Sequence, residues 1–180
     1  MELEELRNAI SAEQKNGAPF IMASIVIWAM ITAVCLLEIP VLTRNLLVFC
    51  CAAPLLPLAW IMGKVIKVDI FGSTNPLSKL GLLFTMNQML YLLIVMWVYS
   101  AVPDKMVMVY AMVFGAHLLP YSWLYKSKAY MIFAVFIPFA ALLLGLMCSA
   151  PAVAAAMAVT DIVFVLLLLQ EVKKTGNRKE

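Results

Sequence analysis

The sequence predicts an all-α polytopic membrane protein, a bundle of six transmembrane helices with a short amphipathic N-terminal helix. Hydrophobic residues make up 65% of the 180 residues and charged residues only 13%, whereas a soluble domain has about 25% charged residues. Apolar stretches of about 18 residues or more, each long enough to cross a hydrocarbon core about 30 Å thick, fill most of the chain. Such segments are expected to pack as one helical bundle.

The first segment, residues 1–17, is expected to form a short cytoplasmic helix that the mature protein retains. Leu3, Leu6 and Ile10 recur on one helical face, and charged side chains cover the rest. The acidic residues near the start are unlike the basic leader of a signal peptide. Two interpretations stay open: a solvated extension, or an interfacial helix lying on the membrane or on the cytoplasmic mouth of the bundle.

Six spans are expected within residues 18–170. They cover approximately residues 19–37, 45–62, 79–100, 105–124, 129–148 and 151–170. The longest connection, Gly63 to Ser78, is polar and rich in turn-forming residues, whereas the connections after the third and fourth spans are short. Residues 171–180 are expected to form a polar cytoplasmic tail.

The basic residues predict the orientation of the bundle. Six spans place both termini on one side, and of the 13 Lys and Arg residues only Arg44 and Lys105 fall on the opposite side. Because cytoplasmic connections carry the excess of Lys and Arg, both termini are expected in the cytoplasm, with the chain in the cytoplasmic (inner) membrane. The net charge of +3 therefore reflects topology, and no nucleic-acid partner is expected.

A carboxylate near the middle of the last span, Asp161, points to a polar intramembrane site. Such a group costs about 2.5–3.5 kcal/mol at a span centre and normally has a partner. At 1.5 Å per residue, His117, Asn87 and Gln88 lie at a similar depth of about 10–13 Å. We expect Asp161 to hold a proton or cation, His117 to be its partner, and Asn87 or Gln88 to orient a ligand. Interhelical hydrogen bonds that merely lock the bundle remain the alternative.

Aromatic residues are expected to line this site, and prolines to bend the helices around it. Tyr110, Phe114, His117 and Tyr121 follow helical spacing, so they form either a stacking face for a flat or cationic ligand or ordinary core. The expected lining is Trp28, Tyr91, Tyr110, Phe114 and Tyr121. The expected hinge positions are Pro54, Pro57, Pro120 and Pro138.

These features favour a transporter or binding protein for a small molecule or ion. Membrane lipid and a small-molecule ligand are the expected partners, and a homodimer is expected because six spans are few for alternating access. No cofactor or metal is expected, since one histidine cannot build a usual zinc site. The alternatives are a non-transporting accessory or interaction membrane protein and an intramembrane enzyme. For the enzyme, the four cysteines show no CxxC spacing.

Two segments carry a resemblance to known sequences. Residues 14–20, Gln-Lys-Asn-Gly-Ala-Pro-Phe, and the segment from His117 to Trp123 resemble short multi-span bacterial membrane proteins grouped in families without an assigned function. The resemblance covers most of the chain. It implies no mechanism, and no functional residue is taken from it.

Overall fold

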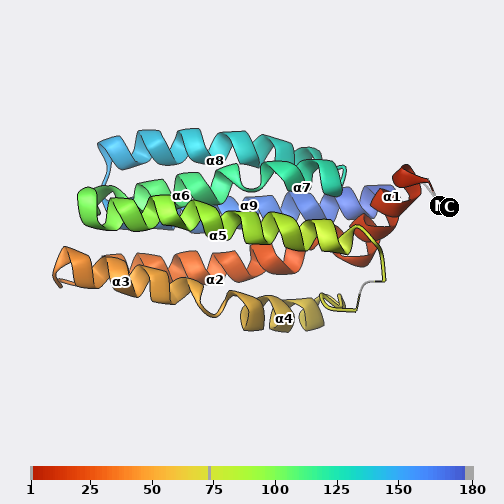
Figure 1. Cartoon of the computed structure of the whole chain (residues 1–180), viewed down its shortest axis with the longest axis horizontal. Coiled ribbons are helices and arrows are strands. Elements are labelled where there is room, and N and C mark those ends of the chain that lie inside the picture. Colours follow the sequence, from red (N-terminus) through yellow and green to blue (C-terminus); the bar gives the residue numbers. More distant parts are fainter. Residues whose placement is uncertain (1, 73, 177–180) are drawn as a thin grey trace.

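The computed structural model describes residues 2–72 and 74–176, which are helical and contain no strand. In chain order the elements are α1 (Leu3–Glu13), η1 (Lys15–Gly17), α2 (Ala18–Cys35), α3 (Val41–Ala52), α4 (Leu55–Val65), α5 (Ser78–Ala101), η2 (Pro103–Lys105), α6 (Met106–Ala116), α7 (Leu119–Leu124), α8 (Lys128–Met147) and α9 (Ala150–Gly176). Figure 1 shows the long helices side by side, with α1 and the end of α9 at the same end of the bundle.

The described residues contain five helical segments long and apolar enough to cross a membrane, or six if α3 and α4 form one span. The five segments are Lys15–Cys35, Ser78–Ala101, Pro103–Leu124, Lys128–Met147 and Ala150–Lys174. These apolar helices indicate membrane insertion and confirm the predicted all-helical class. The predicted count of six depends on how the α3–α4 pair is counted.

The α3–α4 pair is bent by 41°, so the second expected span is two helices rather than one. Pro54 lies at the break, where it cannot donate a helical hydrogen bond. The N–H of Ala53 instead donates to the carbonyl of Cys50 at 3.2 Å, which tightens the last turn of α3. Pro57 falls in the first turn of α4, where proline is tolerated.

The other two expected hinge prolines behave differently from each other. Pro120 lies in the first turn of α7, after α6 has ended at Ala116, but the two helices together still form one segment long enough to cross a membrane, Pro103–Leu124, as expected for the fourth span. Pro138 lies inside α8, which continues without a break to Met147. Pro120 therefore marks a boundary between two helices, whereas Pro138 does not.

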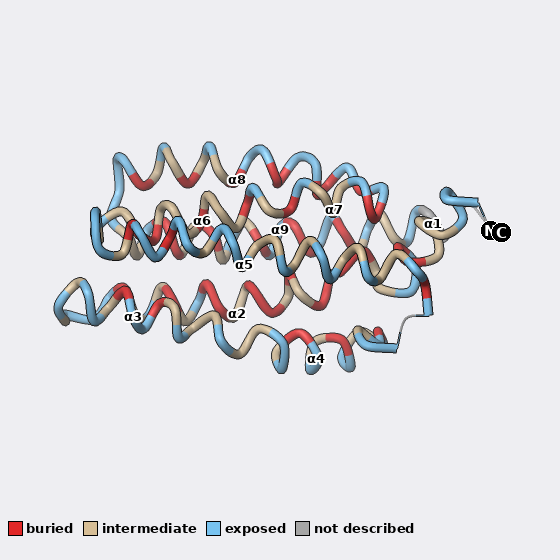
Figure 2. The backbone as a smooth tube through the Cα atoms, in the orientation of Figure 1, coloured by how far each residue is buried: buried red, intermediate tan, exposed pale blue. Residues whose placement is uncertain are grey.

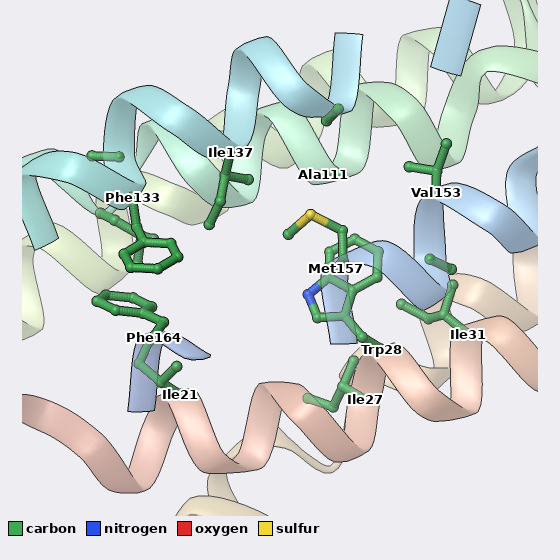
Figure 3. Close-up of a cluster of buried hydrophobic side chains, with 14 of the residues drawn as sticks. Ile21, Ile27, Trp28, Ile31, Ala111, Phe133, Ile137, Val153, Met157 and Phe164 are labelled. Carbon is green, nitrogen blue, oxygen red and sulfur yellow. The ribbon is translucent and has the colours of Figure 1, made fainter. Parts of the chain in front are cut away.

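The core lies between α2, α6, α8 and α9, with α2 and α9 in the most extensive contact. Figure 3 shows Phe133 of α8 lying flat against Phe164 of α9, and their ring centroids are 4.5 Å apart. In the same view Met157 lies beside Trp28. Figure 2 shows buried residues all along α2, whereas α5 is mostly exposed. The apolar surface of α5 is therefore available to lipid.

The end of α9 goes beyond the expected span. A polar tail is expected from Glu171 onward, but α9 continues to Gly176, and residues 177–180 lie outside the described residues. The Glu171 carboxylate accepts hydrogen bonds from the Ser127 hydroxyl at 2.5 Å and from the Ala129 N–H at 2.9 Å. Glu171 thus binds the start of α8, where unpaired backbone N–H groups favour an acceptor with negative charge.

Helix α1 is attached to the bundle through Arg7. The Arg7 guanidinium donates to the carbonyl of Trp123 through Nε at 2.9 Å and Nη2 at 2.5 Å, and it lies 4.5 Å from the centre of the Trp123 ring. Glu4 pairs with Arg7 at 3.0 Å and with Lys126. The hydrogen bond from Lys126 lowers the pKa of Glu4, so this pair persists below the usual titration range of a carboxylate.

Replacing Arg7 with alanine is expected to release α1 from the bundle. Hydrogen bonds to a charged group are worth about 1.5–3 kcal/mol, so the population of chains with α1 detached should rise at least about tenfold. Limited trypsin digestion in detergent, read at Lys15, measures this opening. Arg7→Lys retains the charge but not the planar guanidinium, so its rate of cleavage at Lys15 should lie between those of the wild type and Arg7→Ala. Equal cleavage of Arg7→Ala and wild type would contradict this attachment.

Candidate functional site

A large cavity in the bundle, termed the aromatic cavity, lies between α2, α4, α5 and the α6–α7 segment. Its volume is about 350 Å³, within the range of small-molecule sites. None of its lining residues is Asp, Glu, Lys or Arg. They are Gln14, Gly17, Phe20, Ile21, Ser24, Ile27, Trp28, Ala52, Leu55, Leu56, Ile70, Phe71, Ser78, Gly81, Leu82, Thr85, Gln88, Tyr110, Phe114, His117, Leu118, Tyr121, Tyr125 and Tyr130.

One wall of the aromatic cavity is a continuous series of rings. Trp28 lies 5.6 Å from Tyr110 and 5.8 Å from Phe114, measured between ring centroids. The His117 ring follows at 5.4 Å from Phe114, and Tyr121 at 6.1 Å from His117. Edge-to-face and offset contacts of this kind hold rings in fixed positions. The wall therefore presents preformed aromatic surface to a flat molecule.

The series of rings continues toward the termini with three tyrosines. Tyr121 and Tyr125 stack at 6.1 Å, and Tyr130 lies 5.9 Å from Tyr121. Burial raises the pKa of Tyr125, which keeps its proton, and its hydroxyl donates to Oε1 of Gln14 at 2.7 Å. Gly17 has a φ of 69°, and a Cβ there would lie 3.0 Å from the Tyr130 hydroxyl oxygen. Glycine therefore permits the α1–α2 connection to close this end.

The polar groups that line the aromatic cavity are hydroxyls, amides and one imidazole. The Tyr121 and Thr85 hydroxyl oxygens lie 2.8 Å apart, and the Thr85 hydroxyl also contacts the carbonyl of Gly81 at 3.1 Å. One nitrogen of the His117 ring, Nδ1, is bonded to the carbonyl of Phe114 in its own helix. With Nδ1 as the donor to that carbonyl, the other ring nitrogen is an acceptor. Gln88 adds an amide from α5.

Asp161 is fully buried and contacts Ser24 rather than His117. The Ser24 hydroxyl oxygen lies 2.5 Å from Oδ2 of Asp161 and 2.8 Å from the carbonyl oxygen of Ile21. A serine has one hydroxyl proton and cannot donate to both. A protonated Asp161 satisfies both contacts, because its O–H then donates to Ser24 and Ser24 donates to Ile21. This arrangement fits a neutral carboxylic acid.

The second carboxyl oxygen of Asp161 supports the same interpretation. Oδ1 is buried and has no hydrogen-bond partner within the described part of the chain. An ionised carboxylate with an unpaired oxygen in an apolar interior is strongly unfavourable. Ser24, which lines the aromatic cavity, is therefore the connection between the cavity and the proton that Asp161 would carry.

The structure separates the four residues that the sequence places at one depth. Gln88 and His117 line the aromatic cavity, and Asp161 lies behind Ser24. Asn87 is not part of the lining, and its amide donates to the Tyr91 hydroxyl at 2.9 Å on the exposed side of α5. Of the expected lining residues, Trp28, Tyr110, Phe114 and Tyr121 face the cavity, whereas Tyr91 does not.

Several functional candidates were not anticipated from the sequence. Depth along the spans singles out the larger polar side chains and not the small hydroxyls of Ser24 and Thr85. The signal for Ser24 is its spacing of four residues from Trp28, which places both on one helical face. Further unexpected residues come from the α1–α2 connection, the α7–α8 turn and the first turn of α8; they are Gln14, Gly17, Tyr125 and Tyr130.

The cysteines and possible metal ligands are dispersed. All four cysteines are free: Cys35 is buried, Cys51 is half-buried, and Cys50 and Cys148 are exposed. In the described residues, no three His, Cys, Asp or Glu side chains come together in a way that would hold a metal ion.

The two segments that carry the sequence resemblance meet at the aromatic cavity, since Gln14, Gly17 and Phe20 line it together with residues of the α6–α7 segment. No curated protein and no solved structure matches the chain. The model of a protein family described as a family of unknown function, DUF7010, matches residues 3–171 and so covers both segments. This agrees with the expected resemblance to a family without an assigned function. The chain belongs to the DUF7010 family.

Proposed function

We propose that this protein binds small, flat, neutral or singly cationic molecules in the aromatic cavity, and that it carries a cationic ligand across the membrane in exchange for a proton. The observation that supports the proposal is the cavity of about 350 Å³ with an aromatic wall and no charged lining residue. Aromatic faces attract cations and stack on flat rings. An anion would find no counter-charge in this wall.

Asp161 is proposed as the proton carrier. Its contact with Ser24 gives it a path to the aromatic cavity, and its geometry suits a carboxyl group that is neutral when no cation is present. When a cation enters, release of the proton leaves a negative charge one serine away. A ligand and a proton would then compete for one buried site, which is the arrangement that proton-coupled exchange needs.

Helix α4 is proposed as the element that moves. It contributes Leu55 and Leu56 to the cavity wall, and it packs mainly against α2. The break at Pro54 separates α4 from α3, so α4 can change its angle without moving the rest of the span. Short proline-interrupted helices beside a midplane site are typical of transporters.

The proposal includes the expected placement in the membrane. Both termini are proposed to lie in the cytoplasm, because 11 of the 13 basic residues, all but Arg44 and Lys105, fall on the side of the termini. The inner membrane of a bacterium is proposed from the resemblance to bacterial membrane protein families. A homodimer remains a prediction. The exposed apolar face of α5 is the surface on which a second copy or lipid would lie.

The experiment compares two neighbouring tryptophan substitutions on α5. Gln88 lines the aromatic cavity, whereas Met89 is 51% exposed and does not. Gln88→Trp is expected to fill the cavity and abolish binding, and Met89→Trp to leave it intact. The probes are indole, the cation N-methylquinolinium and the anion naphthalene-2-sulfonate, measured by thermal unfolding in a non-ionic detergent. A probe at about 100 times its Kd stabilises the protein by about 2.7 kcal/mol.

The neutral and cationic probes are expected to stabilise the wild type and Met89→Trp. Neither probe is expected to stabilise Gln88→Trp. Uptake of N-methylquinolinium into proteoliposomes then separates transport from binding alone. Equal stabilisation of both variants would place the probes outside the aromatic cavity. Preference for the anion would contradict the proposed ligand chemistry.

A further inference from the structure

A second cavity, of about 260 Å³, lies at the end of the bundle opposite α1. It is formed where the start of α3, the α5–α6 connection and the α8–α9 turn come together, and Figure 1 shows these turns at the same end. Arg44, Asp104, Lys105 and Ser149 contribute polar groups to its lining. None of these residues takes part in the aromatic cavity, so the two sites are distinct.

Both basic residues of this end of the bundle line the same cavity. The sequence places Arg44 and Lys105 alone on the side opposite the termini, and they come from different helical segments separated by 60 residues of chain. Two like charges that line one small cavity repel each other, and an anion bound between them removes that repulsion. Their convergence therefore favours an anionic ligand.

The described residues supply only part of the compensating negative charge. Asp104 lines the cavity but lies exposed, and neither Arg44 nor Lys105 is within salt-bridge distance of a carboxylate in the described residues. The Nε atom of Arg44 is buried and has no hydrogen-bond partner among them. Lys105 uses one of its three N–H donors on the carbonyl of Gly145 at 2.7 Å, near the end of α8. Donors from both side chains therefore remain for a ligand.

The two cations are held in place by neighbouring contacts. Asn45, next to Arg44, is 1% exposed and its amide donates to the carbonyl of Pro103 at 2.8 Å. This bond joins the start of α3 to the connection that carries Lys105. The bond from Lys105 to Gly145 joins the same connection to α8. A ligand thus meets a preformed pair of cations, which lowers the entropy cost of binding.

We propose that Arg44 and Lys105 bind the phosphate of a phosphodiester, and that its source is the head group of an anionic membrane lipid. Arginine and lysine together are the usual ligands of phosphate oxygens. With Asp104 at the rim, the cavity carries one net positive charge, which matches the single negative charge of a phosphodiester. The ends of membrane-spanning helices lie at the level of lipid head groups, so a cavity at this end of the bundle is within reach of a head-group phosphate.

The test measures binding of dihexanoylphosphatidylglycerol, dihexanoylphosphatidylcholine and inorganic phosphate to the full chain in a non-ionic detergent, by native mass spectrometry and by thermal unfolding. Arg44→Gln and Lys105→Gln should each weaken binding of the phosphatidylglycerol at least about tenfold. Lys79→Gln removes the same charge from an exposed residue at the other end of the bundle and should bind as wild type does. Arg44→Lys, which preserves the charge, should lose less than Arg44→Gln.

The probes distinguish the source of the phosphate. If the protein binds phosphatidylglycerol but not inorganic phosphate, the ligand is a lipid head group. If it binds inorganic phosphate but not phosphatidylglycerol, the ligand is a free anion and the proposed lipid is wrong. Equal binding of phosphatidylglycerol to wild type, Arg44→Gln and Lys105→Gln, while all unfold at similar temperatures, would overturn the site. Binding of N-methylquinolinium to the aromatic cavity should be unchanged in these variants, so the two proposals fail separately.

Discussion

Asp161→Asn is expected to leave the bundle folded and to abolish the pH dependence of cation binding. The asparagine amide can donate to Ser24 as the protonated acid would, so the contact that joins α2 to α9 is retained. In the wild type, exchange of one proton for one cation makes affinity rise up to about tenfold per pH unit. The Kd for N-methylquinolinium at pH 6 and pH 8 measures this. In Asp161→Asn this Kd should change less than about twofold between pH 6 and pH 8.

Two variants distinguish Asp161 from other titrating groups. Glu38 is an exposed carboxylate in the α2–α3 turn, and Glu38→Gln should bind with the same pH dependence as the wild type. His117 lines the aromatic cavity itself, so His117→Gln tests the rival source of the proton. If the pH dependence disappears in His117→Gln and persists in Asp161→Asn, the role proposed for Asp161 is wrong.

Gly115→Ala is expected to destabilise the bundle strongly, although it adds only one methyl group. A Cβ at Gly115 would lie 2.5 Å from Cδ of Pro138 and 2.6 Å from Cγ2 of Ile137. A proline ring and a fully buried β-branched side chain cannot move aside easily. Overpacking of this kind costs about 1–3 kcal/mol. Thermal unfolding in detergent should show a decrease of several degrees for Gly115→Ala.

Gly81→Ala is the matched control, and its effect on stability should be the opposite of that of Gly115→Ala. Its Cβ would meet only Cδ2 of Leu124, at 3.5 Å, which is ordinary contact. Alanine is favoured over glycine in a helix by about 1 kcal/mol, so Gly81→Ala should unfold at the same or a higher temperature. If both alanine variants are equally stable, α6 and α8 do not approach as closely as described.

The helices could be predicted from the sequence because membrane spans are set by local properties. The ends of α5 and α8 fall within one residue of the expected spans, since length and hydropathy determine them. Pro54 and Pro57 predicted a kinked second span, but not that the helix would separate into α3 and α4. That outcome depends on how α4 packs against α2, which no local pattern contains.

The candidate site could be predicted only in part, for a related reason. Helical spacing placed Phe114, His117 and Tyr121 on one face, and this face lines the aromatic cavity. Depth alone placed His117 beside Asp161, but depth says nothing of which helices are neighbours. The neighbour of α9 is α2, which brought Ser24 rather than His117 to the carboxyl group.

The pairing of α2 with α9 also determines how the chain can assemble. These are the first and the last of the apolar helices, and Ser24 and Asp161 are 137 residues apart. During synthesis α2 enters the bilayer long before α9, its main packing partner, has been made. Until then, the face of α2 that carries Ser24 and Trp28 contacts lipid or other helices. Completion of the bundle is therefore a late event that depends on insertion of the last helix. A chain that stops before α9 should be a substrate for quality-control proteolysis rather than a smaller version of the protein.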